Sequence, residues 1–129
     1  MDKRILLVDD DRDFLEQNRS LLEARGYRVA CCSDPDEALH ALRRERADLV
    51  VTDLMMKTLD SGFSLAKAIK SEPDLSAIPV ILVTAVASQR GFDFNPRTRE
   101  ELAAMHADAF FDKPIAPAAL IAKVEELLA

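Results

Sequence analysis

The sequence predicts an α/β fold, in which a doubly wound five-stranded parallel sheet carries helices on both faces. Short apolar runs rich in β-branched residues alternate along the chain with segments whose apolar residues recur at helical spacing. The runs within residues 5–8, 49–53 and 79–84 are the most continuous, which is typical of strands buried on both faces. We therefore place the first, third and fourth strands in the centre and expect the strand order 2-1-3-4-5.

The bounds of the elements follow from capping residues, helix breakers and periodicity. Gly26 stands where a glycine ends a helix, and Asp34 followed by Pro35 is typical of a helix start. The second strand begins with alternating apolar and polar residues, which suits the edge of a sheet. The predicted strands cover residues 5–8, 27–32, 49–53, 79–84 and 107–111, and the predicted helices cover about residues 12–25, 35–45, 62–72, 98–105 and 116–128.

The composition is that of one globular domain. At a length of 129 residues we expect a single domain over residues 1–129, with no output domain in this chain. The net charge of −6 argues against a nucleic-acid surface covering most of the domain, and no apolar run is long enough to cross a bilayer. Cys31 and Cys32 are adjacent and would point to opposite faces of a strand, so we expect free thiols and a cytoplasmic location.

Polar side chains stand at the carboxyl ends of four predicted strands. Asp9 and Asp10 follow the first strand, Asp53 ends the third, Thr84 ends the fourth and Lys113 follows the fifth. The carboxyl ends of parallel strands meet at one edge of the sheet, where ligands bind in this class of fold. Three carboxylates gathered there repel one another unless a cation is present, and oxygen ligands of this kind suit Mg²⁺.

These residue types together indicate phosphoryl transfer. Lys113 supplies a fixed positive charge and Thr84 a small hydroxyl donor, both suited to phosphoryl oxygens. A carboxylate nucleophile at this edge would form an acyl phosphate. Each residue also has a plain structural interpretation: the aspartates after the first strand as a solvated helix start, Lys113 as a surface lysine, and Thr84 as an ordinary strand residue.

Four motifs resemble those of one known family over the whole length of the chain. They stand in order, each at a strand end: Val8-Asp9-Asp10, Asp53-Leu54-Met55-Met56, Thr84-Ala85 and Asp112-Lys113-Pro114-Ile115. In this arrangement the sequence resembles the receiver domain of two-component response regulators. The resemblance implies a flavodoxin-like fold and a phosphorylated signalling domain.

The resemblance assigns the acceptor and the metal ligands. It implies that Asp53 takes a phosphoryl group from a histidine kinase. It also implies that Asp9, Asp10, Asp53 and the backbone carbonyl of Met55 surround Mg²⁺, with Asp10 and Asp53 as direct ligands.

The resemblance also assigns the phosphate ligands and the switch. Thr84 and Lys113 would bind phosphoryl oxygens, and the bond between Lys113 and Pro114 would be cis. Phe110 falls at the position of the switch aromatic, three residues before the lysine, so Thr84 and Phe110 would form the switch. The plain interpretation of Phe110 is a core residue.

The implied partners are proteins. The resemblance implies a sensor histidine kinase or a phosphotransfer protein as donor and a downstream protein as target, with no nucleic acid and no membrane bound by this chain. It leaves open a phosphorylation-dependent homodimer. It implies a phosphoacceptor rather than an enzyme, with self-catalysed phosphoryl transfer and autodephosphorylation left open.

Two other functions compete with this interpretation. A Mg²⁺-dependent aspartyl-phosphate phosphatase of the haloacid-dehalogenase type would use a D-x-D motif, which Asp9 and Asp11 satisfy. However, that family carries its nucleophile on the first strand, and Asp53 would be left unexplained. A receiver-like interaction module without phosphorylation is the other alternative, and the complete acidic set with Lys113 argues against it.

The segment between Thr84 and Lys113 departs from the family pattern. These two residues lie further apart than the family usually shows, and we predict a long loop over residues 85–96. Two phenylalanines of this loop, Phe92 and Phe94, either pack as a small satellite core or anchor a mobile loop over the site. His106 stands where glycine is common before the fifth strand.

Overall fold

The computed structural model describes residues 3–53, 61–84, 106–113 and 115–129. Within these ranges the chain forms a five-stranded sheet of order β2-β1-β3-β4-β5, and every pair of neighbouring strands is parallel. The predicted fold class and strand order are therefore confirmed. None of the described helices combines the length and the apolar character needed to cross a membrane.

The described elements alternate between strands and helices. The strands are β1 (Arg4–Val8), β2 (Arg28–Cys32), β3 (Leu49–Asp53), β4 (Val80–Thr84) and β5 (Ala109–Asp112). The helices are α1 (Arg12–Glu23), α2 (Pro35–Arg44), α3 (Ser61–Ser71) and α6 (Pro117–Leu128). The predicted helix over residues 98–105, the predicted loop, Met55 and Pro114 lie outside the described residues.

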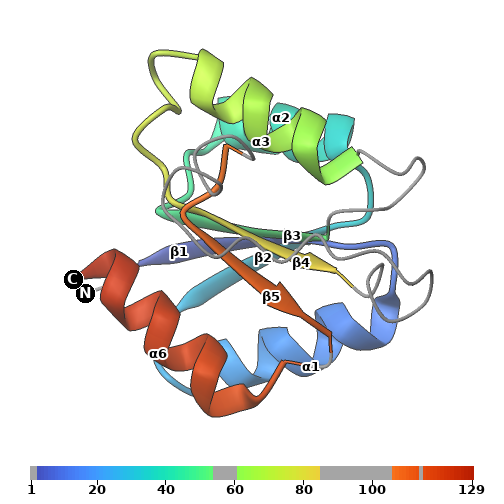
Figure 1. Cartoon of the computed structure of the whole chain (residues 1–129), viewed down its shortest axis with the longest axis vertical. Coiled ribbons are helices and arrows are strands. Elements are labelled where there is room, and N and C mark those ends of the chain that lie inside the picture. Colours follow the sequence, from blue (N-terminus) through green and yellow to red (C-terminus); the bar gives the residue numbers. More distant parts are fainter. Residues whose placement is uncertain (1–2, 54–60, 85–105, 114) are drawn as a thin grey trace.

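The core consists of two apolar clusters, one on each face of the sheet. Helices α2 and α3 cover one face, and α1 and α6 cover the other (Figure 1). Along β1, Leu6 and Val8 join the cluster beneath α2 and α3, whereas Ile5 and Leu7 join the cluster beneath α1 and α6. This alternation follows from the two-residue period of a strand. Strand β3 is buried along its whole length, as expected for a central strand.

Gly26 ends the first helix as the sequence predicts. Its φ of +94° lies in the left-handed region, which glycine adopts without a steric cost. The Tyr27 amide donates to the Leu22 carbonyl at 3.2 Å and the Gly26 amide donates to the Glu23 carbonyl at 3.0 Å. These two bonds form a Schellman motif, which brings the chain back into β2. The regular part of α1 ends at Glu23, two residues before the predicted end of this helix.

Strand β5 begins later than predicted, at Ala109 instead of residue 107. The carboxylate of Asp108 accepts hydrogen bonds from the Val80 amide at 2.8 Å and from Lys70 Nζ at 3.1 Å. Lys70 Nζ also donates to the Ile78 carbonyl at 2.7 Å. The Asp108 amide also donates to the Val80 carbonyl at 2.8 Å. Asp108 is therefore bonded to β4 by its backbone and by its side chain, and β5 starts at the next residue.

A substitution at His106 can test for backbone strain in the segment before β5. Its φ is 58°, in the left-handed region where a side chain is unfavourable. We expect His106→Gly to raise the free energy of unfolding by about 0.5–1 kcal/mol, because the relieved strain exceeds the extra entropy of glycine in the unfolded chain. Urea denaturation measures the change. His106→Ala keeps a Cβ and should bring no such gain, and an equal gain in both variants would contradict the strain argument.

Candidate functional site

Three carboxylates gather at the carboxyl edge of the sheet. Asp9, Asp10 and Asp53 each place one oxygen within 4.8 Å of the other two. Asp9 and Asp53 are buried, with 0% and 7% of their surface exposed, whereas Asp10 is exposed. The site therefore has a buried floor of two acidic groups and one acidic group that faces solvent.

The pairing of the strands brings these residues together. Strand β1 lies beside β3, with Val8 aligned with Thr52, so Asp9 follows β1 at the level where Asp53 ends β3. The Asp9 amide continues the ladder by donating to the Cys32 carbonyl of β2 at 3.0 Å. Two carboxylates far apart in sequence are thus fixed at one point by backbone hydrogen bonds.

Asp11 has a different role from its two neighbours. Its side chain is the N-cap of α1 and accepts hydrogen bonds from the amides of Asp13 at 3.0 Å and Phe14 at 3.4 Å. Its own amide donates to Asp9 Oδ1 at 2.8 Å. The helix-start interpretation of the acidic run therefore holds for Asp11, while Asp9 and Asp10 belong to the carboxylate cluster.

Lys113 brings a positive charge to the cluster. Its Nζ donates to Asp9 Oδ2 at 2.7 Å and lies 3.7 Å from Asp53 Oδ2. The lysine side chain is half-buried, so this pairing is only partly screened by water. The Lys113 ammonium thus lies close to both buried carboxylates. A group bound to Asp53 would therefore lie close to this ammonium as well.

The electrostatics of the cluster favour an additional cation. Burial raises the pKa of Asp9 above its ordinary value, and the hydrogen bond from Lys113 only partly offsets this effect. The charge of Asp10 also raises the pKa of Asp9. Among the residues that the structure describes, three carboxylates face one ammonium group, so negative charge is in excess. The oxygen donors fit a hard divalent cation such as Mg²⁺, which binds through one or two carboxylates and keeps several waters.

Thr84 and Phe110 are placed by the register of the last two strands. Thr84, the last residue of β4, is aligned with Asp112 of β5, so its backbone lies at the edge that carries Lys113. Phe110 is aligned with Leu82 and is half-buried. Its neighbour Phe111 packs on the cluster beneath α1 and α6, so Phe110 lies on the opposite face of β5. The switch role of both residues stays a prediction.

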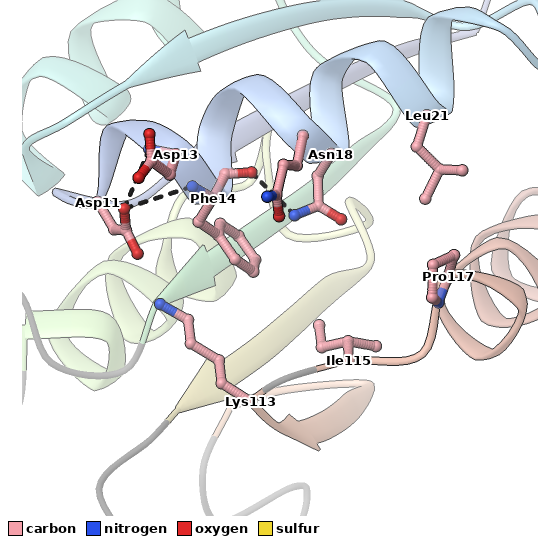
Figure 2. A pocket seen from close by; sticks show the side chains of 9 residues that line it. Asp11, Asp13, Phe14, Asn18, Leu21, Lys113, Ile115 and Pro117 are labelled. Carbon is pink, nitrogen blue, oxygen red and sulfur yellow. Dashed lines mark hydrogen bonds between the residues drawn. The ribbon is translucent and has the colours of Figure 1, made fainter.

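A cavity of about 690 Å³ opens beside Lys113, between α1 and the start of α6 (Figure 2). At one end of it the Phe14 ring lies against Lys113, with Nζ 4.4 Å from the ring centroid. In the sequence, Phe14 falls on the apolar face of the helix predicted over residues 12–25, with no sign of a distant partner. Its place in the first turn after the acidic run was the one available signal. The described residues that line the cavity are Asp11, Asp13, Phe14, Gln17, Asn18, Leu21, Lys113, Ile115 and Pro117.

Comparison with known proteins agrees with this geometry. Residues 5–125 match the family model of the response regulator receiver domain. This chain belongs to that family. Receiver domains of this family are the signalling domains of two-component systems, and they are not classed as enzymes.

Individual relatives are similar over nearly the whole receiver domain. The transcriptional regulatory protein GltR of Pseudomonas aeruginosa is 32% identical over 126 residues, which are 98% of this chain and 49% of that protein. The chain spans about half the length, or less, of the curated relatives that it matches.

Solved structures of receiver domains have the same fold. One is the receiver domain of a sensor histidine kinase from Pseudomonas aeruginosa, with a magnesium ion coordinated in its active site cleft. It is 26% identical, covers 99% of this chain and 98% of its own, and has a TM-score of 0.80. The chemotaxis response regulator CheY4 of Vibrio cholerae is 24% identical, with a TM-score of 0.83 over 99% of this chain and all of its own.

The pKa of Asp9 makes the stability of the metal-free receiver domain depend on pH. Because burial raises this pKa above its value in the unfolded chain, the folded state holds the proton more tightly. The contribution of Asp9 to stability is therefore highest below the unfolded pKa and is lost as the pH rises through the folded pKa.

Asp9→Asn removes this titration. In EDTA we expect the variant to be more stable than the wild type at neutral pH and to lose this advantage as the pH falls through the folded pKa. Urea denaturation from acid to neutral pH measures both curves. Asp74→Asn, an exposed carboxylate away from the site, controls for general effects of charge. A wild type that is more stable than Asp9→Asn at neutral pH would contradict a raised pKa of Asp9 in the folded domain.

Proposed function

We propose that this receiver domain accepts a phosphoryl group on Asp53 from a sensor histidine kinase or a phosphotransfer protein. One observation carries the proposal: Asp53 ends a central strand beside Asp9 and Asp10, with the Lys113 ammonium 3.7 Å from its Oδ2. The carboxylate attacks the phosphorus of the donor, and the phosphoryl group leaves the donor histidine to form an acyl phosphate on Asp53.

The acidic cluster supports a role for Mg²⁺ in this reaction. Asp10 and Asp53 would hold the ion directly, and Asp9 would complete the acidic surroundings together with the backbone carbonyl of Met55. When bound, Mg²⁺ supplies the charge that neutralises the phosphoryl oxygens. The similar receiver domain of the P. aeruginosa sensor histidine kinase, which coordinates a magnesium ion in its active site cleft, supports a metal at this site.

Lys113 and Thr84 would bind the transferred group. The Lys113 ammonium already lies between the two buried carboxylates, so it needs only a small shift to donate to a phosphoryl oxygen. Thr84 ends the neighbouring strand at the same edge, and its hydroxyl would donate to a second oxygen. Both groups stabilise charge on the equatorial oxygens, which is the main requirement of phosphoryl transfer.

Phosphorylation would change the surface that a partner binds. Thr84, drawn towards the phosphate, would leave space for Phe110, which shifts the population between two packings of β4 and β5. The output would be recognition by a downstream protein or by a second phosphorylated copy. We also propose autodephosphorylation of the acyl phosphate and action in the cytoplasm. The extent of the domain over residues 1–129 stays a prediction.

The phosphatase alternative is disfavoured by the described structure. Its D-x-D motif would need Asp9 as nucleophile and Asp11 beside it in the site. Asp9 is buried and bonded to Lys113 Nζ and the Asp11 amide, and the Asp11 carboxylate caps α1. Neither carboxylate is arranged for that chemistry, whereas the position of Asp53 supports its proposed role as the acceptor.

Labelling with a small phosphodonor tests the acceptor. In the presence of Mg²⁺ and acetyl phosphate, intact mass should show one phosphoryl adduct on the wild type and none on Asp53→Asn. The loss should be complete, because the amide cannot form an acyl phosphate. Asp13→Asn, which changes an exposed carboxylate in α1, should label like the wild type. Undiminished labelling of Asp53→Asn would overturn the assignment.

Thermal unfolding tests the metal site without any phosphodonor. At a Mg²⁺ concentration ten times the dissociation constant, binding should stabilise the wild type by about 1.4 kcal/mol. Asp10→Asn should lose most of this gain, because it removes a direct ligand charge. Asp11→Asn is the matched control, since asparagine also caps helices and the net charge changes equally. An equal Mg²⁺ effect in Asp10→Asn and the wild type would remove Asp10 from the site.

A further inference from the structure

We propose that Phe14 is a positioning residue for Lys113. Its ring holds the ammonium group over the Asp9–Asp53 side of the site, so that the lysine is in place before a phosphoryl group arrives. The inference rests on the proposed function, because it needs Lys113 to bind the phosphoryl group on Asp53.

Three groups of the described residues meet the Lys113 ammonium. Asp9 Oδ2 accepts its hydrogen bond at 2.7 Å, Asp53 Oδ2 lies at 3.7 Å, and the centroid of the Phe14 ring lies at 4.4 Å. The last distance is within the range of a cation–π contact, in which the negative face of the ring attracts the cation. The ring therefore supplies an attraction to the ammonium in addition to that of the two carboxylates.

The cavity beside Lys113 explains why the contact with the Phe14 ring would affect the position of the lysine. Lys113 and Phe14 both line it, and Figure 2 shows the ring at the end of the cavity where the ammonium lies. A lysine carries a long flexible stem and a strongly hydrated ammonium, so an open space beside it offers many other conformations. Asp11 and Asp13 are exposed acidic groups that line the same cavity. The ring limits the access of Lys113 to this space and to those competing charges.

The position of the ring is fixed by the start of α1. The Phe14 amide donates to the N-cap Asp11, and the Phe14 carbonyl accepts a bond from Asn18 Nδ2 at 2.8 Å. The half-buried side chain packs on the cluster beneath α1 and α6. The amide of Asp11 in turn donates to Asp9 Oδ1 at 2.8 Å. Residues 9–14 thus position two of the three groups that meet the Lys113 ammonium, the Asp9 carboxylate and the Phe14 ring.

An aromatic ring suits this role better than a further carboxylate would. It attracts the ammonium without accepting one of its three N–H donors in a strong hydrogen bond. When the Asp53 carboxylate becomes an acyl phosphate, the donor that serves Asp9 can pass to a phosphoryl oxygen while the ring contact persists. A carboxylate in place of the ring would compete with the phosphoryl oxygens for the same donors.

Three variants separate this role from simple packing. Phe14→Tyr keeps the aromatic face, Phe14→Leu keeps an apolar side chain without that face, and Leu21→Ala changes another residue of α1 that lines the same cavity. The rate of labelling by acetyl phosphate at saturating Mg²⁺ should fall about three- to tenfold in Phe14→Leu, the size expected for a cation–π contact. The rate should stay near the wild-type value in Phe14→Tyr and Leu21→Ala. Urea denaturation of all variants shows whether the fold is retained.

A spectroscopic signature tests the contact itself. The ε-methylene protons of Lys113 should show an upfield ring-current shift in the wild type and in Phe14→Tyr, and this shift should be lost in Phe14→Leu. In a Lys113→Met background, Phe14→Leu should cause no further fall in the labelling rate, because Phe14 acts through the lysine.

The outcomes distinguish this inference from the proposed function. Absence of labelling in the wild type would overturn the proposed function and the positioning role together. Labelling of the wild type with an equal rate in Phe14→Leu, or an equal loss in Phe14→Tyr and Phe14→Leu, would overturn the positioning role alone. Absence of the ring-current shift in the wild type would do the same.

Discussion

The ion pair between Asp9 and Lys113 is the interaction on which the site depends. It joins residues 104 positions apart, one just after the first strand and the other just after the last described strand. A fully buried carboxylate is costly to desolvate, and a charged hydrogen-bond partner offsets much of that cost. The pair therefore forms only when the whole sheet is assembled, so the acidic site exists only in the folded domain.

The strand order explains why the site lies where it does. Because β1 lies between β2 and β3, the chain winds in opposite directions on the two sides of β1, and the crevice of such a sheet opens at this point. Asp9 and Asp53 end up there because β1 and β3 are neighbours. Helix α1, which follows β1, covers one face of the sheet, and α3, which follows β3, covers the other (Figure 1). The fold thus brings acidic residues from separate strands to one edge without any local sequence proximity.

The sequence predicted those features that local rules control, and it missed those that depend on contacts across the fold. Apolar runs, Gly26 and the strand-end aspartates were sufficient for the strand order, the end of α1 and the carboxylate cluster. The contact of Phe14 with Lys113 was not predictable, because helical periodicity assigns Phe14 to the apolar face without saying which distant side chain it meets. The bonds of Asp108 before β5 were not predictable for the same reason, since they join it to another strand and to α3.

Asp9, Asp10 and Asp11 are consecutive, but their carboxylates lie in three different environments, because the chain turns from β1 into α1 at this point. Asp9 still belongs to the ladder and points its carboxylate inward to Lys113. Asp10 follows as the exposed member of the cluster, open to an ion from solvent. Asp11 is the N-cap of α1, and its carboxylate accepts hydrogen bonds from amides of the first turn. An exposed carboxylate can coordinate an ion that arrives from solvent without first losing a bond inside the protein. The exposure of Asp10 therefore leaves its carboxylate accessible from solvent, whereas the carboxylates of Asp9 and Asp11 are bonded to Lys113 and to the first turn of α1.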